Sequence, residues 1–221
     1  MKFEFSCLYW NNVDERMLSA HKRVMNHFHI KVNYYNIDGL NHGTWMQWVI
    51  ERSPNDVIVF IEPDCIPLNF NFLEYIKFAH RNDTFLGIAQ VANHIAPQTH
   101  IYAGPGFYAI SKKAYEKLGR PNLQATESVD TAEAISYIAE KNGIKYRALM
   151  PTYFEKQVVD GPWHLGNLGY FGIGTVYDNS IYHLFQARMA QNISLFTERC
   201  AQVIDGKFTT HGFISSTALI I

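Results

Sequence analysis

Five consecutive apolar residues, Val57 to Ile61, run directly into two carboxylates, Glu62 and Asp64. A run that is apolar at every position is typical of a strand buried on both faces of a parallel sheet. Residues i and i+2 of an extended chain point to the same side, so both carboxylates can face one point just past the strand end. Pro63 restricts the backbone between them. The segment therefore predicts a central strand with an acidic site at its carboxyl end.

The segments around this strand alternate between strand-type and helix-type patterns. Strands are expected at 3–10, 31–38 and 56–64, separated by helices at 15–28 and 42–53. Further helices are expected at 69–82, 112–119 and 130–143, and further strands at 84–93, 107–111 and 145–155. Residues 104–106 are predicted to form a turn, 163–180 an irregular glycine-rich loop, and 181–204 a segment that begins extended and becomes helical. This alternation predicts an α/β fold whose mostly parallel, Rossmann-type sheet is flanked by helices.

The composition is that of a globular chain. With 221 residues, 48% of them hydrophobic, the chain can bury the core of one large domain. A charged fraction of 18% and a net charge of −1 exclude a disordered chain and a global attraction to nucleic acid or anionic membranes. Three cysteines without metal-type spacing argue against a disulfide framework. No signal peptide or membrane-spanning run is recognised, so a cytoplasmic protein is expected.

The paired carboxylates and a late histidine predict a metal site. Two like charges held in one cleft repel each other unless a cation separates them, and hard oxygen ligands suit Mn²⁺ or Mg²⁺. His183 and Arg188 follow the glycine-rich segment, so the imidazole could complete the site and the guanidinium could meet a phosphate. The alternatives are that Asp64 caps the next segment and that His183 is a structural residue.

Four motifs together resemble the nucleotide-sugar glycosyltransferases with the GT-A fold, family-2-like members in particular. FIEPDCIPLN (60–69) resembles their metal-binding strand end, and IYHLFQAR (181–188) resembles their late histidine motif. The Asn-His-Gly at 41–43 resembles the turn before the helix that precedes the acidic motif. Gly-Pro-Gly at 104–106 resembles the glycine turn of the sugar and acceptor pocket. The motifs occur in the family's order.

The resemblance implies a site and a domain organisation. It implies a GT-A-like domain over 1–190, with a nucleotide-binding half at 1–100 and an acceptor half at 101–190, and a packed tail at 191–221. It implies Mn²⁺ or Mg²⁺ as cofactor, a UDP-sugar as favoured donor, Asp64 and His183 as metal ligands, and Glu62 at the ribose or metal-bound water. The donor site would comprise Tyr9, Asn11, Asp38, Asn41, His42, Asp64 and Arg188, and the acceptor or sugar pocket Gly104, Gly106, Trp163 and His164.

Two departures from the family pattern concern the donor. The first acid of the metal motif is Glu62 rather than aspartate, and LYWNN (8–12) replaces the usual Pro-x-Tyr/Phe-Asn. The second departure leaves the base specificity open. The segment from Gly161 to Asp178 is a candidate lid, in which Trp163, His164 and Tyr170 would stack on sugar or base or would pack underneath.

The resemblance also implies an inverting hexosyl- or pentosyltransferase, whose base precedes a helix that ends in glycine. Asp130 and Glu133 are the catalytic candidates, with Thr131 where the usual base would lie. The alternative is that Asp130 and Glu133 form only a capping box.

Three alternatives remain for the function. The acidic pair would equally serve a metal-dependent nucleotidyltransferase, which has no need of His183, and the same fold could be a non-catalytic nucleotide-sugar-binding module. The acceptor could be a glycan or a modified base in DNA. The DNA alternative depends on Lys112, Lys113, Lys117 and Arg120, which would equally form a solvated helix face.

Overall fold

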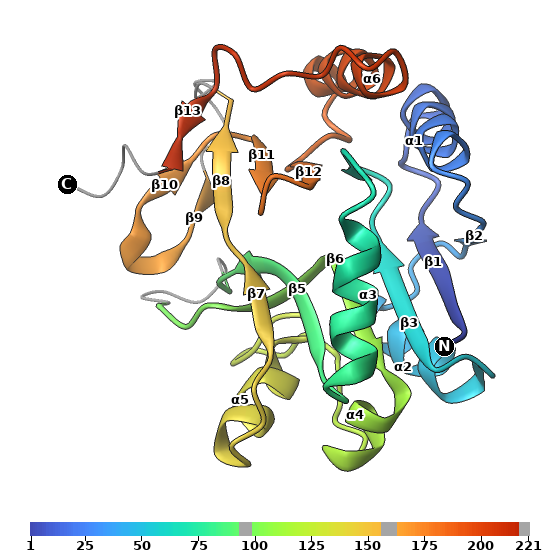
Figure 1. Ribbon diagram of the computed structural model, residues 1–221, viewed down its shortest axis with the longest axis vertical. Helices are drawn as coiled ribbons and strands as arrows, with labels where there is room; N and C mark the ends of the chain where they lie inside the picture. The colour runs from blue at the N-terminus through green and yellow to red at the C-terminus, as the bar shows by residue number, and fades with distance from the viewer. Residues whose placement is uncertain (93–98, 156–162, 217–221) are drawn as a thin grey trace.

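The computed structural model has a six-stranded central sheet in the order β2-β1-β3-β6-β5-β7 (Figure 1). It describes residues 1–92, 99–155 and 163–216. The strands are β1 (Phe3–Tyr9), β2 (Val32–Asn36), β3 (Val57–Ile61), β5 (Phe85–Gln90), β6 (Tyr102–Ser111) and β7 (Arg147–Leu149). The pairs β1–β2, β1–β3 and β5–β7 are parallel, and the two pairs that involve β6 are antiparallel. The predicted α/β fold with a mostly parallel sheet is confirmed.

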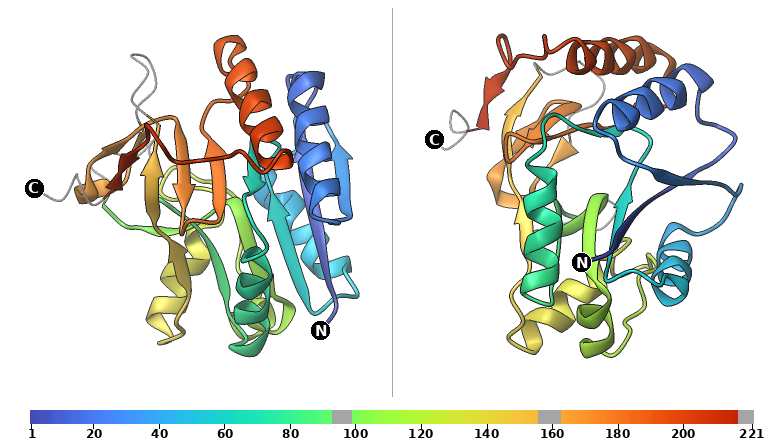
Figure 2. Two further views of the ribbon diagram at one scale, coloured as in Figure 1. Left: turned by 45° about the horizontal axis from the view of Figure 1, so that its top comes forward. Right: turned by 45° about the vertical axis from the view of Figure 1, so that its right-hand side comes forward.

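Both faces of the sheet are covered by helices, which explains the uninterrupted apolar run of β3. The helices are α1 (Glu15–His27), α2 (His42–Arg52), α3 (Phe72–Arg81), α4 (Lys112–Lys117), α5 (Glu133–Lys141) and α6 (Ala190–Ile204). Val57, Val59 and Ile61 pack with α1 and α3, whereas Ile58 and Phe60 pack with α2, α4 and α5. Helix α6 packs against α1 (Figure 2). None of the described helices is long and apolar enough to cross a membrane.

A second, five-stranded antiparallel sheet has the order β13-β8-β11-β12-β4. Its strands are β4 (Cys65–Pro67), β8 (Pro151–Phe154), β11 (Gly174–Tyr177), β12 (Ile181–Leu184) and β13 (Ile214–Ser215). Residues 145–155, predicted as one strand, divide into β7 and β8, which lead from the central sheet into the second one (Figure 1).

The irregular loop predicted for 163–180 is wrong, because this segment contains β11 and a short hairpin. The hairpin consists of β9 (Trp163–His164), the 3-10 turn η1 (Gly166–Leu168) and β10 (Tyr170–Phe171). Asp178 and Asn179 both have positive φ, and the Ser180 N–H donates to the Tyr177 carbonyl at 2.9 Å. Asp and Asn tolerate this backbone region, so they form the tight connection from β11 to β12.

The Gly-Pro-Gly turn predicted for 104–106 is also wrong, because these residues lie inside β6. The register between β5 and β6 shifts between Gly87 and Ile88, as at a β-bulge. Proline suits such an irregularity because it has no N–H to donate to the neighbouring strand.

Candidate functional site

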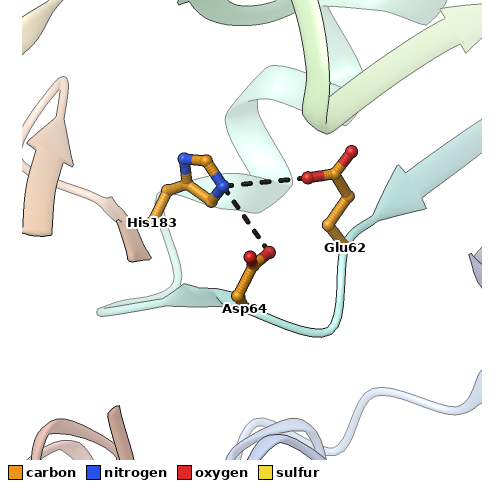
Figure 3. Close-up of side chains that lie close together, drawn as sticks. All are labelled: Glu62, Asp64 and His183. Atoms are coloured by element: carbon orange, nitrogen blue, oxygen red, sulfur yellow. Dashed lines mark ion pairs between the residues drawn. The ribbon is translucent and has the colours of Figure 1, made fainter. Parts of the chain in front are cut away.

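Glu62, Asp64 and His183 point toward one another beyond the carboxyl end of β3 (Figure 3). Their ligand atoms all lie within 4.8 Å of one another. Nε2 of His183 lies 3.5 Å from Oδ1 of Asp64 and 3.7 Å from Oε2 of Glu62. The structure thus brings together the three residues that the sequence proposed as a metal site.

The pairing of β4 with β12 in the second sheet places His183 beside Glu62 and Asp64. Strand β4 begins directly after Asp64 and pairs with β12 in a register that sets His183 opposite Cys65. The Leu184 N–H donates to the Asp64 carbonyl at 3.0 Å, which ties the two segments beside the site. On the other side, the Glu62 N–H donates to the Gly106 carbonyl at 2.9 Å.

Gly106 leaves room for the site. A Cβ at this position would lie 2.6 Å from Cδ1 of Ile88 and 3.7 Å from Cδ2 of His183. The absence of a side chain therefore allows β6, β5 and the imidazole to meet.

Burial and mutual interaction shift the pKa values of Glu62 and His183. Burial, reinforced by the charge of Asp64, raises the pKa of Glu62 to about 7. Burial lowers the pKa of His183, but attraction to Asp64 and Glu62 outweighs it, so the net pKa of His183 is raised.

One buried carboxylate oxygen at the site makes no hydrogen bond of ordinary geometry with the described residues. It is Oδ1 of Asp64, whose nearest charged neighbour is Nε2 of His183 at 3.5 Å. A buried carboxylate oxygen in that position, beside a second acid and an imidazole, fits a divalent cation of the Mn²⁺ or Mg²⁺ type.

A cavity of about 290 Å³ opens beside these residues, and we call it the main cavity. It is lined by His42, Glu62, Asp64, Ile88, Ala89, Gln90, Pro105, Asp130, Thr131, Tyr177, His183, Phe185, Gln186 and Arg188. A hollow of about 170 Å³ shares His42, Glu62, Asp64 and Arg188 with it and is also lined by Tyr9, Trp10 and Asn12. The predicted donor residues Tyr9, His42 and Arg188 therefore meet the acids, and Asp130 faces the same cavity.

Other predicted donor residues lie at this edge of the sheet without lining either space. The Asn11 N–H donates to Oδ1 of Asp38 at 3.3 Å, and both residues are exposed. Oδ1 of Asn41 accepts from the Thr44 N–H at 3.1 Å and caps helix α2. This contact accounts for the polar residue before α2.

His42 differs from its neighbours in this turn. Its Nδ1 lies 3.5 Å from Oε1 of Glu62, and burial lowers the pKa of His42 to about 4. A neutral imidazole beside Glu62 lines both spaces.

The comparisons with known proteins find similarity of fold and none of sequence family. No family model and no curated protein matches the sequence. The chain is similar to the crystal structure of A197 from STIV, with 13% identity, a TM-score of 0.48, and coverage of 84% of this chain and 95% of that one.

Two enzymes are similar at a lower level. One is a CMP:2-keto-3-deoxy-manno-octonic acid synthetase complexed with CTP, with 10% identity, a TM-score of 0.40, and coverage of 68% of this chain and 90% of that one. The other is a glycosyltransferase involved in glycosylation of the major capsid of PBCV-1, with 12% identity, a TM-score of 0.41, and coverage of 66% and 80%. Likenesses of this size carry no conclusion about chemistry.

The two catalytic candidates are placed differently. Asp130 lines the main cavity, and its Oδ1 accepts from the Thr131 N–H at 2.7 Å. Glu133 is not among the described lining residues, and its side chain is fully buried.

The predicted helix start is partly wrong. Helix α5 begins at Glu133 rather than Asp130, because Ala132 has a φ of 62° and interrupts the helical backbone. One half of the capping box does form, since the Asp130 N–H donates to Oε2 of Glu133 at 2.8 Å.

The predicted acceptor and sugar residues are only partly brought to the site. Gly104 lies in β6 against Gln90, whose side chain would be displaced by a Cβ there. Trp163 and His164 form β9, and His164 is not among the described lining residues. The first residues of the predicted lid, 161–162, lie outside the described residues.

Sequence reasoning missed Gln90 and Gln186, which both line the main cavity. Gln90 ends β5 and could have been found, because polar residues at the carboxyl end of a strand face the ligand edge of such sheets. Gln186 has a positive φ of 58°, which no motif indicated.

The basic run of Lys112, Lys113 and Lys117 lies at the opposite edge of the sheet from the acids. Ser111 pairs with Val57 at the start of β3, whereas Glu62 follows its end. A strand of five residues spans roughly 16 Å. In Figure 1, α4 accordingly lies at the bottom of the view, whereas the arrow of β3 points upward, toward its carboxyl end. The run is therefore not placed to hold an acceptor at the main cavity.

Proposed function

We propose that this chain is a metal-dependent glycosyltransferase that moves a sugar from a nucleoside diphosphate sugar, with a UDP-sugar favoured, to an acceptor hydroxyl with inversion. One observation carries the proposal. The metal-type cluster of Glu62, Asp64 and His183 shares one cavity with a separate carboxylate, Asp130, and a guanidinium, Arg188.

The first requirement of the reaction is to hold the diphosphate leaving group of the donor. Glu62, Asp64 and His183 would hold Mn²⁺ or Mg²⁺, and such an ion neutralises the diphosphate as its bond to the sugar breaks. Arg188, which lines both the main cavity and the adjoining hollow, binds phosphate oxygens as a fixed planar donor. The hollow beside Tyr9 and Trp10 receives the nucleoside.

The second requirement is to activate the acceptor hydroxyl. An acceptor oxygen attacks the anomeric carbon, and the bond from that carbon to the diphosphate breaks with its electron pair. The hydroxyl proton passes to a carboxylate oxygen of Asp130, which acts as general base. Attack from the side opposite the leaving group inverts the anomeric configuration.

The lining favours a neutral, hydroxyl-bearing acceptor such as a glycan. Gln90, Thr131 and Gln186 line the cavity, and side chains of these types can both donate and accept hydrogen bonds as sugar hydroxyls do. The basic run that would favour a modified DNA base lies at the other edge of the sheet.

A thermal-shift panel of nucleotide sugars, each with and without Mn²⁺, tests the proposal. A ligand at 100 times its dissociation constant stabilises the folded state by about 2.7 kcal/mol. For a chain of this size the midpoint is expected to rise by roughly 5–10 °C. The shift should need both the ion and one nucleotide sugar, and product analysis should then show the sugar on the acceptor.

The other outcomes separate the alternatives. A shift with a nucleoside triphosphate but with no nucleotide sugar would indicate a nucleotidyltransferase. A shift with a nucleotide sugar, without its hydrolysis or transfer, would indicate a binding module. No shift with any donor would contradict the proposal.

A further inference from the structure

The carboxylate of Glu133 is fully buried but does not reach the main cavity. Its Oε2 accepts from the Asp130 N–H at 2.8 Å, and its Oε1 accepts from the Tyr137 hydroxyl at 3.1 Å. The Glu133 N–H in turn donates to the Asp130 carbonyl at 3.0 Å. Both the backbone N–H and the backbone carbonyl of Asp130 are therefore held by one residue.

His100 holds Glu133 from the other side. Its Nδ1 lies 3.3 Å from Oε1 of Glu133, its Nε2 lies 2.9 Å from Oε1 of Glu140, and its ring stacks on Tyr137 with 4.0 Å between centroids. Glu140 also accepts from the Tyr146 hydroxyl at 2.7 Å. The imidazole thus lies between two carboxylates, of which only Glu140 is substantially exposed.

Glu133 and His100 each favour the charged form of the other. The hydrogen bond to Glu133 raises the pKa of His100 despite partial burial. Burial raises the pKa of Glu133, but hydrogen bonds from His100, the Asp130 N–H and Tyr137 outweigh it, so the net pKa is lowered. An ionised Glu133 accepts stronger hydrogen bonds than a neutral group in its place would.

The Asp130 loop needs such an anchor, because it lies outside regular secondary structure. Residues 120–132 form neither a helix nor a strand. The Ala132 N–H donates to the Leu123 carbonyl at 2.9 Å, and Ala132 adopts the left-handed backbone region. Non-glycine residues adopt this region only where the surroundings hold them there.

We propose that Glu133 and His100 are positioning residues that fix Asp130 toward the main cavity. This inference rests on the proposed function only in taking Asp130 as the base. Glu133 holds the Asp130 main chain, and His100 keeps Glu133 ionised and oriented. Neither residue touches the reacting atoms.

The direct test is hydrogen exchange of the Asp130 amide, followed by NMR on the full chain without metal or substrate. In Glu133→Leu this amide loses its acceptor and is expected to exchange at least about tenfold faster, because hydrogen bonds to charged groups are the stronger ones. In Glu133→Gln an amide oxygen can still accept, so a smaller, severalfold increase is expected. The Ala139 amide within α5 should be unchanged in both variants.

Glu140→Gln is the matched control, because it removes the other carboxylate of His100 without touching Asp130. Its Asp130 amide should exchange within about twofold of the wild-type rate. Equal acceleration in Glu140→Gln and Glu133→Gln would overturn the inference, as would an unchanged rate in Glu133→Gln. Because the unchanged-rate criterion uses Glu133→Gln, it applies even where Glu133→Leu does not fold.

A kinetic measurement separates this inference from the proposed function. With a donor and acceptor in hand, Glu133→Gln should lower kcat severalfold and leave the KM for the donor unchanged. An unchanged kcat with faster amide exchange would overturn positioning. Faster exchange in a chain that transfers no sugar would overturn the proposed function and leave the anchoring of Asp130 intact.

The pH dependence of stability gives a further prediction for His100, faced by Glu133, Glu140, Tyr137 and, through Glu140, Tyr146. Its pKa is raised in the folded state, so its contribution is complete below its unfolded value of about 6.5 and is lost as the pH rises through the folded value. His100→Gln should therefore destabilise the protein more at about pH 6 than at about pH 9 in urea unfolding. A difference that does not vary with pH would contradict this.

Discussion

Replacing Asp64 by asparagine is expected to abolish the Mn²⁺-dependent binding of the nucleotide sugar and, with it, the transfer reaction. Asparagine has nearly the same size and retains one carbonyl oxygen, but it removes a charge from the cluster with Glu62 and His183. Changes to residues that merely support metal ligands weaken affinity by about 10–100-fold, so loss of a ligand charge should exceed about a hundredfold. Calorimetric titration with Mn²⁺ measures this directly.

The metal-free stability of the same variant provides an internal control. After burial, charge repulsion from Asp64 is the main cause of the raised pKa of Glu62, and Asp64→Asn relieves that repulsion while removing the attraction between Asp64 and His183. Because the two effects oppose each other, the thermal midpoint without ligand is expected to change little. A lost metal response with an intact midpoint separates a binding defect from unfolding.

Asp205→Asn is the matched substitution elsewhere, since Asp205 is exposed at the end of α6. It should leave Mn²⁺ affinity unchanged. Retained Mn²⁺-dependent donor binding in Asp64→Asn would remove the metal site from the proposal. His183→Gln adds a further distinction, because a nucleotidyltransferase would tolerate it and the proposed transferase would lose metal affinity.

The central sheet could be predicted from sequence because its signals are local. The run from Val57 to Ile61 is apolar at every position since both faces of β3 are covered by helices. The carboxylates that follow are two residues apart on an extended chain, which predicts their common direction without any knowledge of the fold.

The second sheet could not be predicted in this way. Strand β4 has only the three residues Cys65–Pro67, too few to show a period, and its partner β12 is more than a hundred residues away in the sequence. The pairing of His183 with Cys65 is therefore a property of tertiary packing. The sequence did predict that 181–204 begins extended, as β12 does, and the Asp178-Asn179 pair was a local signal for the turn that joins β12 to β11.

The placement of Asp130 also depends on packing that the sequence does not display. A Cβ at Gly43 would overlap the Leu123 carbonyl oxygen, so the first turn of α2 lies directly against the loop that leads to Asp130. The resemblance assigns Asn41 and His42 of the Asn-His-Gly motif to the donor site. In the structure, Gly43 gives the loop that leads to Asp130 room to approach helix α2, while His42 faces Glu62.

Replacing Asp130 by asparagine is expected to lower kcat by about 10²–10⁴-fold while leaving the affinity for the donor unchanged. The oxygen that accepts from the Thr131 N–H is retained in asparagine, so the local turn persists. The substitution removes the negative charge and with it the capacity to take a proton. Calorimetry with donor and Mn²⁺, together with single-turnover rates, separates the two quantities.

Thr131→Val is the matched control, because Thr131 lines the same cavity and stands where the resemblance would place the base. A threonine hydroxyl does not serve as a general base near neutral pH, so this variant should retain kcat within a few-fold, while its KM for the acceptor rises because one of the acceptor-binding hydroxyl groups is lost. The anomeric configuration of the product, read by NMR, adds an independent measurement. A product of inverted configuration with a slow Asp130→Asn variant agrees with Asp130 as base. A fast Asp130→Asn variant, or a product of retained configuration, assigns the proton to another group, because direct displacement with base assistance can only invert.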